Sequence, residues 1–457
     1  MVCDVLIVGG GPAGASLAIL LAQQNWRVVL VDHGRGRCSG PYETLLAPGR
    51  TMLSRTGLSA AIEACSEVDP LRHGAIWGTS AVAWRSEGEP GLLLRRGAFD
   101  RRLCEQARRV GVDVRMATMV TCVGDEWQLA TTTGGERLRP NHVVLATGRT
   151  TRAVGEASAV AAAPRSLAFT FTGTPHRDDR GTALVEAVGS GWIWTHAPHD
   201  GVASAAVIVH ADELRAVGRE RLLARALAES GGAAGRLGDR QLANVSDATP
   251  RLRPALPGVL RIGDAAATID PLASQGVEKA LAAADHAAAV LTAARAQPDW
   301  WLRLCEVHAR WERGLFDAHA DVAAAWYRRE QRFAEHAFWR ARLLPVEERT
   351  PPSFSQWFVV SPQLLRAQVL VREGHTFVER SGFSDQVTGE QATHCGYVPI
   401  EPLLAQFATA RSLAAAVAGA GQDARLFVLP PRAVLAAMLQ LVQRGWLRAA
   451  TNAAGVP

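Results

Sequence analysis

Lysine is almost missing from this sequence. Of its 49 basic residues only one, Lys279, is a lysine, and the others are arginines spread along the chain. The net charge of +5 is small for 457 residues, and an arginine bias without clusters is not the charge pattern of a nucleic-acid surface. We therefore expect no nucleic-acid partner.

Long apolar runs and paired cysteines are missing too. No apolar stretch reaches the ~18 residues of a membrane-spanning helix, and residues 1–4 lead straight into the first apolar run, which leaves no room for a signal peptide. The seven cysteines are scattered without a C-x-x-C pair, as is typical of reduced thiols. These features predict a globular cytoplasmic protein with no membrane partner and no bound metal.

A glycine turn near the N-terminus is the strongest motif. Residues 5–8 have the apolar, β-branched composition of a buried parallel strand, and leucines at helical spacing follow the glycines. Gly9 permits a tight turn, Gly11 lets a pyrophosphate approach the backbone, and Gly14 lets the helix pack closely on the strand. The predicted dinucleotide site at the helix N-terminus comprises Gly9, Gly11, Pro12, Ala13 and Gly14.

An acidic residue follows in register. A second apolar run, residues 27–31, ends at Asp32, which is placed to accept hydrogen bonds from ribose hydroxyls at close to the expected spacing of about 20 residues. The alternative, a glycine-rich loop without a ligand, does not explain why strand, turn, helix, strand and acid occur in this order.

Later segments change pattern. Residues 142–149 form another buried strand that ends in a glycine turn, where a doubly wound fold returns to its ligand. Between residues 166 and 245 alternating strands predict an inserted, largely antiparallel sheet that carries the substrate side of the cleft. Beyond Asp299 the chain becomes helical and rich in aromatic residues, and Pro351-Pro352 marks a boundary.

Four separated motifs occur in the order of a known family. They are the glycine turn with Asp32, Arg96-x-x-Phe99-Asp100, Ala146-Thr147-Gly148-Arg149, and Gly263-Asp264-Ala265-Ala266 followed by Asp270-Pro271-Leu272 and Ser274-Gln275-Gly276. In these motifs the chain resembles the FAD-dependent aromatic hydroxylase and halogenase superfamily, the group A flavoprotein monooxygenases. The resemblance covers roughly residues 1–345.

This resemblance implies that the cofactor is FAD. It implies that Asp264 holds the ribityl chain, that Arg96 reaches the pyrophosphate or ribityl region, and that Val120 offers backbone contacts to adenine. A helix beginning at Gly276 would point at the pyrimidine end of the flavin, where a helix N-terminus stabilises the negative charge of the reduced ring. The predicted cofactor-binding residues are Gly9, Gly11, Pro12, Ala13, Gly14, Asp32, Arg96, Val120, Gly263, Asp264, Pro271, Gln275 and Gly276.

One segment resembles the halogenase branch only in part. Residues 191–198 contain a tryptophan-x-tryptophan pair, Trp192 and Trp194, but His196 and Ala197 replace the isoleucine and proline of that signature. Halogenases also need a lysine to take up hypohalous acid, and the corresponding loop, residues 37–43, has none. We therefore interpret both tryptophans as packing beneath the cleft and keep halogenation as an alternative.

A halogenase-like body without that lysine, extended by a C-terminal module, resembles the flavin monooxygenases that mature tryptophylquinone cofactors. This implies hydroxylation of an electron-rich ring through a C4a-hydroperoxyflavin, with a tryptophan side chain in a peptide or protein as substrate. Glu43 is the candidate catalytic residue, which binds the indole N–H or relays protons. The alternatives are a hydroxylase of small aromatic molecules, an FAD-dependent reductase and a non-catalytic flavin-bearing assembly factor.

The electron source and the partner stay open. The family's usual aspartate is Thr147 here, so the reductant is either NAD(P)H or reduced flavin from a flavin reductase. The C-terminal segment resembles a winged-helix unit, which either holds a peptide or partner protein or packs as a cap.

The predicted fold class is α/β, with a Rossmann-like FAD-binding domain, an inserted antiparallel sheet and a small, mainly helical C-terminal domain. The predicted boundaries are residues 1–165 and 246–350 for the FAD-binding domain with its helical extension, 166–245 for the substrate-binding sheet, and 360–457 for the C-terminal domain.

Overall fold

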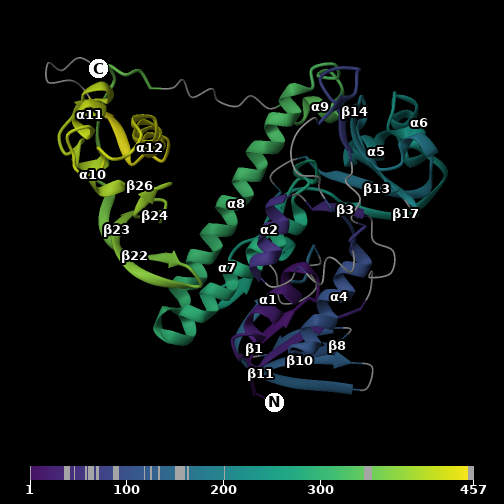
Figure 1. Ribbon diagram of the computed structural model, residues 1–457, viewed down its shortest axis with the longest axis horizontal. Coiled ribbons are helices and arrows are strands. Elements are labelled where there is room, and N and C mark those ends of the chain that lie inside the picture. The colour runs from purple at the N-terminus through teal and green to yellow at the C-terminus, as the bar shows by residue number, and fades with distance from the viewer. Residues whose placement is uncertain are drawn as a thin grey trace. The chain divides into compact units, whose positions relative to one another are not determined.

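The structure, a computed structural model, contains two compact units, Met1–Leu344 and Pro345–Pro457. It describes residues 2–34, 42–45, 47–56, 59, 66–67, 72–85, 92–117, 119–123, 126–131, 134–149, 160–161, 164–199, 201–343 and 352–450 (Figure 1). Within these ranges no helix combines the length and the apolar character needed to cross a membrane.

A parallel sheet forms the centre of the first unit. β1 (Val2–Val8) pairs in parallel with β2 (Val28–Asp32) and with β11 (Gly134–Leu145). β8 (Asp113–Met116) extends the sheet beyond β2, and β19 (Val259–Arg261) extends it beyond β11. Burial on both faces explains the unbroken apolar runs of β1 and β2, and the predicted Rossmann-like sheet is confirmed.

Helices and an antiparallel layer cover this sheet. α1 (Pro12–Ala22) packs against α4 (Arg96–Arg109) and α7 (Gly276–Ala296), and the three helices lie together in Figure 1. β9 (Met119–Val123) and β10 (Glu126–Thr131) form an antiparallel meander with β11. Side chains of the meander and of the parallel strands share one apolar core, which includes Leu6, Val8, Val29, Val31, Val120, Trp127, Leu129, Leu138, Val143 and Leu145.

A second sheet carries the inserted segment. Its strand order is β17-β13-β16-β15-β14-β5-β6. The bounds are β13 (Ser166–Pro175), β14 (Thr182–Val188), β15 (Gly191–Ala197), β16 (Ala203–His210), β17 (Leu237–Asp247), β5 (Arg72–Ile76) and β6 (Ala83–Trp84). β5 pairs in parallel with β14 and was not predicted, because five residues that include a glycine carry too little apolar alternation.

Each face of the second sheet packs on helices. One face of this sheet packs against α5 (Ala211–Val217) and α6 (Arg219–Ala228). The other face packs against aromatic side chains of α8 (Trp301–Arg329) and α9 (Ala337–Arg340). Because α8 also contacts β19, it connects the parallel sheet to the inserted sheet (Figure 1).

Short elements complete the first unit. β3 (Tyr42–Leu45), β4 (Ser66–Glu67) and β7 (Leu92–Arg95) form a small sheet, α2 (Ala47–Thr56) follows β3, and β12 (Val160–Ala161), β18 (Arg251–Leu252) and β20 (Ala267–Thr268) form another sheet.

The described part of the second unit contains the helices α10 (Ile400–Ala405), α11 (Leu413–Ala420) and α12 (Pro431–Gln443). Around them lie β21 (Trp357–Val360), β27 (Arg411–Ser412) and β28 (Leu447–Ala450), which form one sheet, together with β24 (Gln391–Ala392), β25 (His394–Cys395) and β26 (Val398–Pro399).

A long hairpin makes this unit less helical than predicted. β22 (Leu364–Glu373) pairs along its whole length with β23 (Thr376–Asp385). Most of its side chains are partly or fully exposed, so the apolar alternation that identifies a strand is weak.

Candidate active site

The glycine turn brings three backbone segments into direct contact. Gly9 has a φ of 115°, and a Cβ there would lie 2.1 Å from the carbonyl oxygen of Ala146. A Cβ at Gly14 would lie 1.9 Å from the carbonyl oxygen of Gly9. Neither position has room for a side chain, so the turn holds the start of α1 close to the ends of β1 and β11.

Gly11 is different, because its neighbourhood is open. A Cβ at Gly11 would meet nothing within 4 Å, and among the described residues no side chain caps the N-terminus of α1. Space beside uncapped N–H groups at a helix N-terminus fits a pyrophosphate. The structure therefore has room for the predicted group at the predicted place.

The ribose and adenine end lies at the tip of β2. Asp32 is buried, and its Oδ1 accepts hydrogen bonds from the backbone N–H groups of His33 at 2.6 Å and Gly34 at 3.3 Å. Val120 belongs to the same apolar core as Val31, the neighbour of Asp32. Asp32 therefore ends β2 and Val120 packs in the core beside that strand, while their contacts with the cofactor stay predictions.

The turn after β19 carries the next predicted residues toward α1. Gly263 has a φ of 61°, and a Cβ there would lie 2.9 Å from the Cβ of Ala13. Asp264 follows, and its Oδ2 lies 4.0 Å from Nε of Arg149. The helix N-terminus and Asp264 are therefore neighbours, as an extended dinucleotide needs.

A cavity of about 190 Å³ lies between the inserted sheet and the residues around Asp264. Pro271, Gln275 and Gly276 line it at the start of α7, where a Cβ at Gly276 would meet nothing within 4 Å. The facing sheet contributes mainly small side chains: Ala168, Thr170, Ser204, Ala206, Ser246 and Ala248. Small side chains opposite an open helix N-terminus leave room for a flat ring system.

Glu43 lies at the edge of this cavity on β3. Its Oε1 accepts a hydrogen bond from Nη1 of Arg96 at 2.5 Å, and Nε of Arg96 lies 3.3 Å from Oδ1 of Asp100. Burial lowers the pKa of Arg96, but the charges of Glu43 and Asp100 outweigh burial and raise this pKa above its ordinary value. Arg96 thus joins the candidate catalytic residue to α4, and its contact with the cofactor stays a prediction.

Trp194 and His196 form an aromatic wall of the cavity. Their ring centroids are 4.5 Å apart, and Nε2 of His196 lies 3.3 Å from Oγ1 of Thr44. Burial lowers the pKa of His196 to about 3, so its imidazole is neutral at physiological pH. Trp192 packs in the core as expected. Trp194 lies on the same face of β15 and packs against that core, but it also lines the cavity, so its interpretation as packing alone was incomplete.

Asp270 lines the cavity, although the sequence analysis included it only in a family motif and not among the predicted site residues. Its Oδ2 accepts a hydrogen bond from the Tyr327 hydroxyl at 3.0 Å, and its Oδ1 accepts one from the Leu272 N–H at 2.9 Å. Burial raises the pKa of Asp270. These bonds fix the short helical turn Pro271–Ala273 and the left-handed Ser274, which lead into α7.

Lys279, the only lysine of the chain, does not line the cavity. Its Nζ donates a hydrogen bond to the carbonyl oxygen of Gly263 at 2.9 Å, and its side chain is fully buried. The cavity is therefore lined without a lysine.

Comparisons with known proteins agree with this geometry. A family model of pyridine nucleotide-disulphide oxidoreductases matches residues 3–170. A tryptophan 2-halogenase of Chondromyces crocatus is 26% identical over 378 residues, which cover 75% of this chain and 71% of that protein.

Two solved structures share the fold over nearly the whole chain. The peptidyl tryptophan dihydroxylase QhpG, described as essential for tryptophylquinone cofactor biogenesis, has a TM-score of 0.71 at 20% identity and covers 97% of this chain and 100% of its own. CmlS, a flavin-dependent halogenase, has a TM-score of 0.73 at 19% identity, with 100% and 97% covered.

The fold and the site define an FAD-dependent enzyme. In sequence and fold the chain is similar to flavin-dependent halogenases and hydroxylases. The predicted resemblance, the α/β fold class with its Rossmann-like domain, the FAD cofactor and the enzyme class are thereby confirmed.

Proposed function

We propose that this enzyme hydroxylates an electron-rich aromatic ring, and that the ring is the indole of a tryptophan side chain in a peptide or protein during quinone cofactor biogenesis. The observation that carries the proposal is the cavity itself. It joins Asp264 and the N-terminus of α7 on one side to Trp194 and His196 on the other, without a lysine.

FAD, when bound, supplies the electron transfer and oxygen activation that ring hydroxylation requires. The chain holds it through the open turn at Gly11, Asp32 at the ribose end, Asp264 at the ribityl chain and the N-terminus of α7 at the flavin ring. The positive dipole end of α7 stabilises negative charge there.

The cavity walls suit an indole. Trp194 offers a ring for stacking or edge contact, which stabilises an aromatic pair by about 0.5–1.5 kcal/mol. Neutral His196 and Thr44 add polar atoms without a charge.

Glu43 supplies a carboxylate on the substrate side of the site. Its carboxylate lies at the cavity edge and is held by Arg96 at 2.5 Å. We assign it to accept the indole N–H and to relay protons as the ring is hydroxylated. An electron-rich indole needs little deprotonation, so we expect this group to orient the substrate more than to activate it.

Oxygen insertion is favoured over halogenation by the position of the single lysine. Capture of hypohalous acid would require an amine in the cavity, whereas Lys279 is buried against Gly263. The name of the tryptophan halogenase relative supports an indole substrate, and that of the dihydroxylase supports oxygen insertion into a peptide.

The proposal also covers the electron donor, the partner protein and the cellular compartment. We propose that NAD(P)H or a flavin reductase supplies electrons, and that the C-terminal unit binds the partner that presents the peptide. Buried thiols at Cys3, Cys104, Cys305 and Cys395 suit the cytoplasm.

The test is product analysis with competing outcomes. The protein is reconstituted with FAD and given a flavin reductase, NADH, oxygen, chloride and bromide, together with free tryptophan or tryptophan-containing peptides from proteins encoded beside it. We expect a peptide that gains the mass of one or two oxygen atoms. A halogenated or reduced product would overturn the proposal, and hydroxylation of free tryptophan alone would remove its peptide part.

A further inference from the structure

We propose that Lys279 is a positioning residue for the cofactor site. Together with His308 it holds the corner between β19 and Gly263, and through this corner it fixes Asp264 against the flavin's ribityl chain. The inference rests on the proposed FAD contact of Asp264 and adds residues that do not touch the cofactor.

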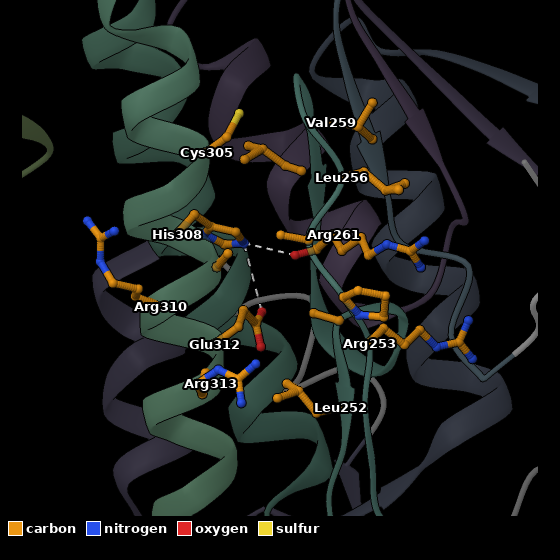
Figure 2. A pocket seen from close by; sticks show the side chains of 15 residues that line it. Leu252, Arg253, Leu256, Val259, Arg261, Cys305, His308, Arg310, Glu312 and Arg313 are labelled. Atoms are coloured by element: carbon orange, nitrogen blue, oxygen red, sulfur yellow. Dashed lines mark hydrogen bonds and ion pairs between the residues drawn. The ribbon is translucent and has the colours of Figure 1, made fainter. Parts of the chain in front are cut away.

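Two side chains from different helices hold this corner by its carbonyl oxygens. Nζ of Lys279, on α7, donates to the carbonyl oxygen of Gly263 at 2.9 Å. Nε2 of His308, on α8, lies 2.8 Å from the carbonyl oxygen of Arg261 (Figure 2). The two acceptors are two residues apart, so the corner is fixed at both ends.

The His308 ring is held in one tautomer by its surroundings. Burial lowers the pKa of His308 to about 4, so the ring is neutral and its Nε2 carries the proton given to Arg261. Its Nδ1 lies 3.0 Å from Nδ1 of His286, which must then be the donor. His286 in turn stacks on Trp311 with ring centroids 4.4 Å apart.

Glu312 provides the counter-charge. Its Oε2 lies 3.5 Å from Nζ of Lys279, and both side chains are buried. Burial raises the pKa of Glu312 to about 6, although the positive charge of Lys279 acts to lower this pKa. The other charged or titratable groups that face it are His308, at 3.9 Å, and Asp264. A buried ion pair is costly for stability, so its presence beside the cofactor site needs a reason other than stability.

That reason is the conformation of Gly263. Glycine adopts positive and negative φ about equally readily, so its own sterics do not hold its φ at 61°, and Asp264 follows directly. A separate cavity of about 130 Å³, lined by Arg253, Arg261 and Glu312, adjoins the corner (Figure 2). Without the two hydrogen bonds the corner has space into which it can relax, and Asp264 would move with it.

The experiment replaces the ion pair by apolar side chains. Removing one partner of a buried pair can unfold a protein, whereas replacing both is often tolerated. The variant is therefore the double substitution Lys279→Met with Glu312→Leu, and its thermal unfolding is measured first. FAD affinity of the apo-protein is then titrated by flavin fluorescence, with and without Asp264→Ala.

We expect the double substitution to weaken FAD binding roughly tenfold, the equivalent of one lost hydrogen bond. In the Asp264→Ala background we expect the same double substitution to have almost no further effect, because Lys279 acts on FAD binding through the position of Asp264. Equal weakening in both backgrounds would mean a general structural role and would overturn the inference, as would unchanged affinity.

Hydrogen exchange of the apo-protein provides a second readout that does not require FAD. We expect faster exchange of the backbone amides of residues 261–265 in the double variant and unchanged exchange in β13. Unchanged exchange of these amides would refute the proposal that Lys279 holds the corner. Failure of the parent protein to bind FAD would instead refute the proposed cofactor site, while the exchange result would still decide whether Lys279 holds the corner.

Discussion

Two glycines of the same turn are expected to respond to alanine in opposite ways. At Gly14 the added Cβ would lie 1.9 Å from the carbonyl oxygen of Gly9 and 3.0 Å from the Cβ of Ala146. Backbone must move to relieve this contact, which we expect to cost at least about 1–3 kcal/mol of unfolding free energy. At Gly11 the added Cβ would meet nothing within 4 Å and φ is an ordinary −71°, so we expect a loss of at most about 1 kcal/mol.

Cofactor binding separates the two variants further. The space beside Gly11 is where we expect the pyrophosphate, so Gly11→Ala should weaken FAD binding by about 100-fold or more, nearly 3 kcal/mol, in a stably folded protein. The assays are thermal unfolding of the apo-protein and titration with FAD, with Gly14→Ala as the matched comparison. If Gly11→Ala bound FAD like the parent protein, the assignment of this turn to the pyrophosphate would be wrong.

Further predictions concern the cavity and the inserted sheet. Glu43→Gln should lower hydroxylation and raise hydrogen peroxide release without changing FAD affinity, as product analysis and peroxide assays would show; unchanged turnover and coupling would remove Glu43 from the reaction. His196 is neutral when buried, with a pKa of about 3, whereas its pKa is ~6.5 in the unfolded chain, so the unfolded state binds the extra proton and stability falls as pH drops below about 6.5. Between pH 7 and pH 5 the free energy of unfolding, measured with urea, should therefore fall by about 2 kcal/mol more in the parent protein than in His196→Phe. Parallel pH profiles of the two proteins would contradict this. Glu186, buried in β14, accepts hydrogen bonds from the backbone N–H groups of Gly231 at 2.7 Å and Ala233 at 2.6 Å, so Glu186→Gln should cost about 2–4 kcal/mol in urea unfolding while FAD affinity stays unchanged.

The cofactor end of the protein could be predicted from sequence because its determinants are local. A strand, a turn with fixed glycine positions and a helix follow one another in about 20 residues, and the apolar run ending in Asp32 follows directly. The structure shows why the spacing is strict, since Gly9 and Gly14 both contact backbone. Steric requirements of this kind leave a clear record in a single sequence.

The substrate side was harder to predict, because its residues meet only after folding. Thr44 lies 152 positions before His196, and Tyr327 lies 57 positions after Asp270. Nothing in either local segment indicates its partner. Trp194 is a milder case, since alternation along its strand does give a face, but the sequence does not show which face meets the cavity.

Lys279 illustrates the limit of an argument from composition. The sequence showed only that the single lysine lies outside the loop at residues 37–43, and in the structure Lys279 does not line the cavity. Its contacts with Gly263 and Glu312 depend on α7, α8 and β19 packing together. That three-element contact could not be predicted from sequence spacing.

The central claim is that this flavin enzyme inserts oxygen from dioxygen into an indole ring. The most direct measurement is the mass of a tryptophan-containing substrate peptide after turnover under isotopically labelled dioxygen, with fragmentation to locate the label. We predict that each added oxygen carries the label and lies on the tryptophan side chain. Unlabelled oxygen on the ring, a halogen in its place, or a product without added oxygen would contradict the account.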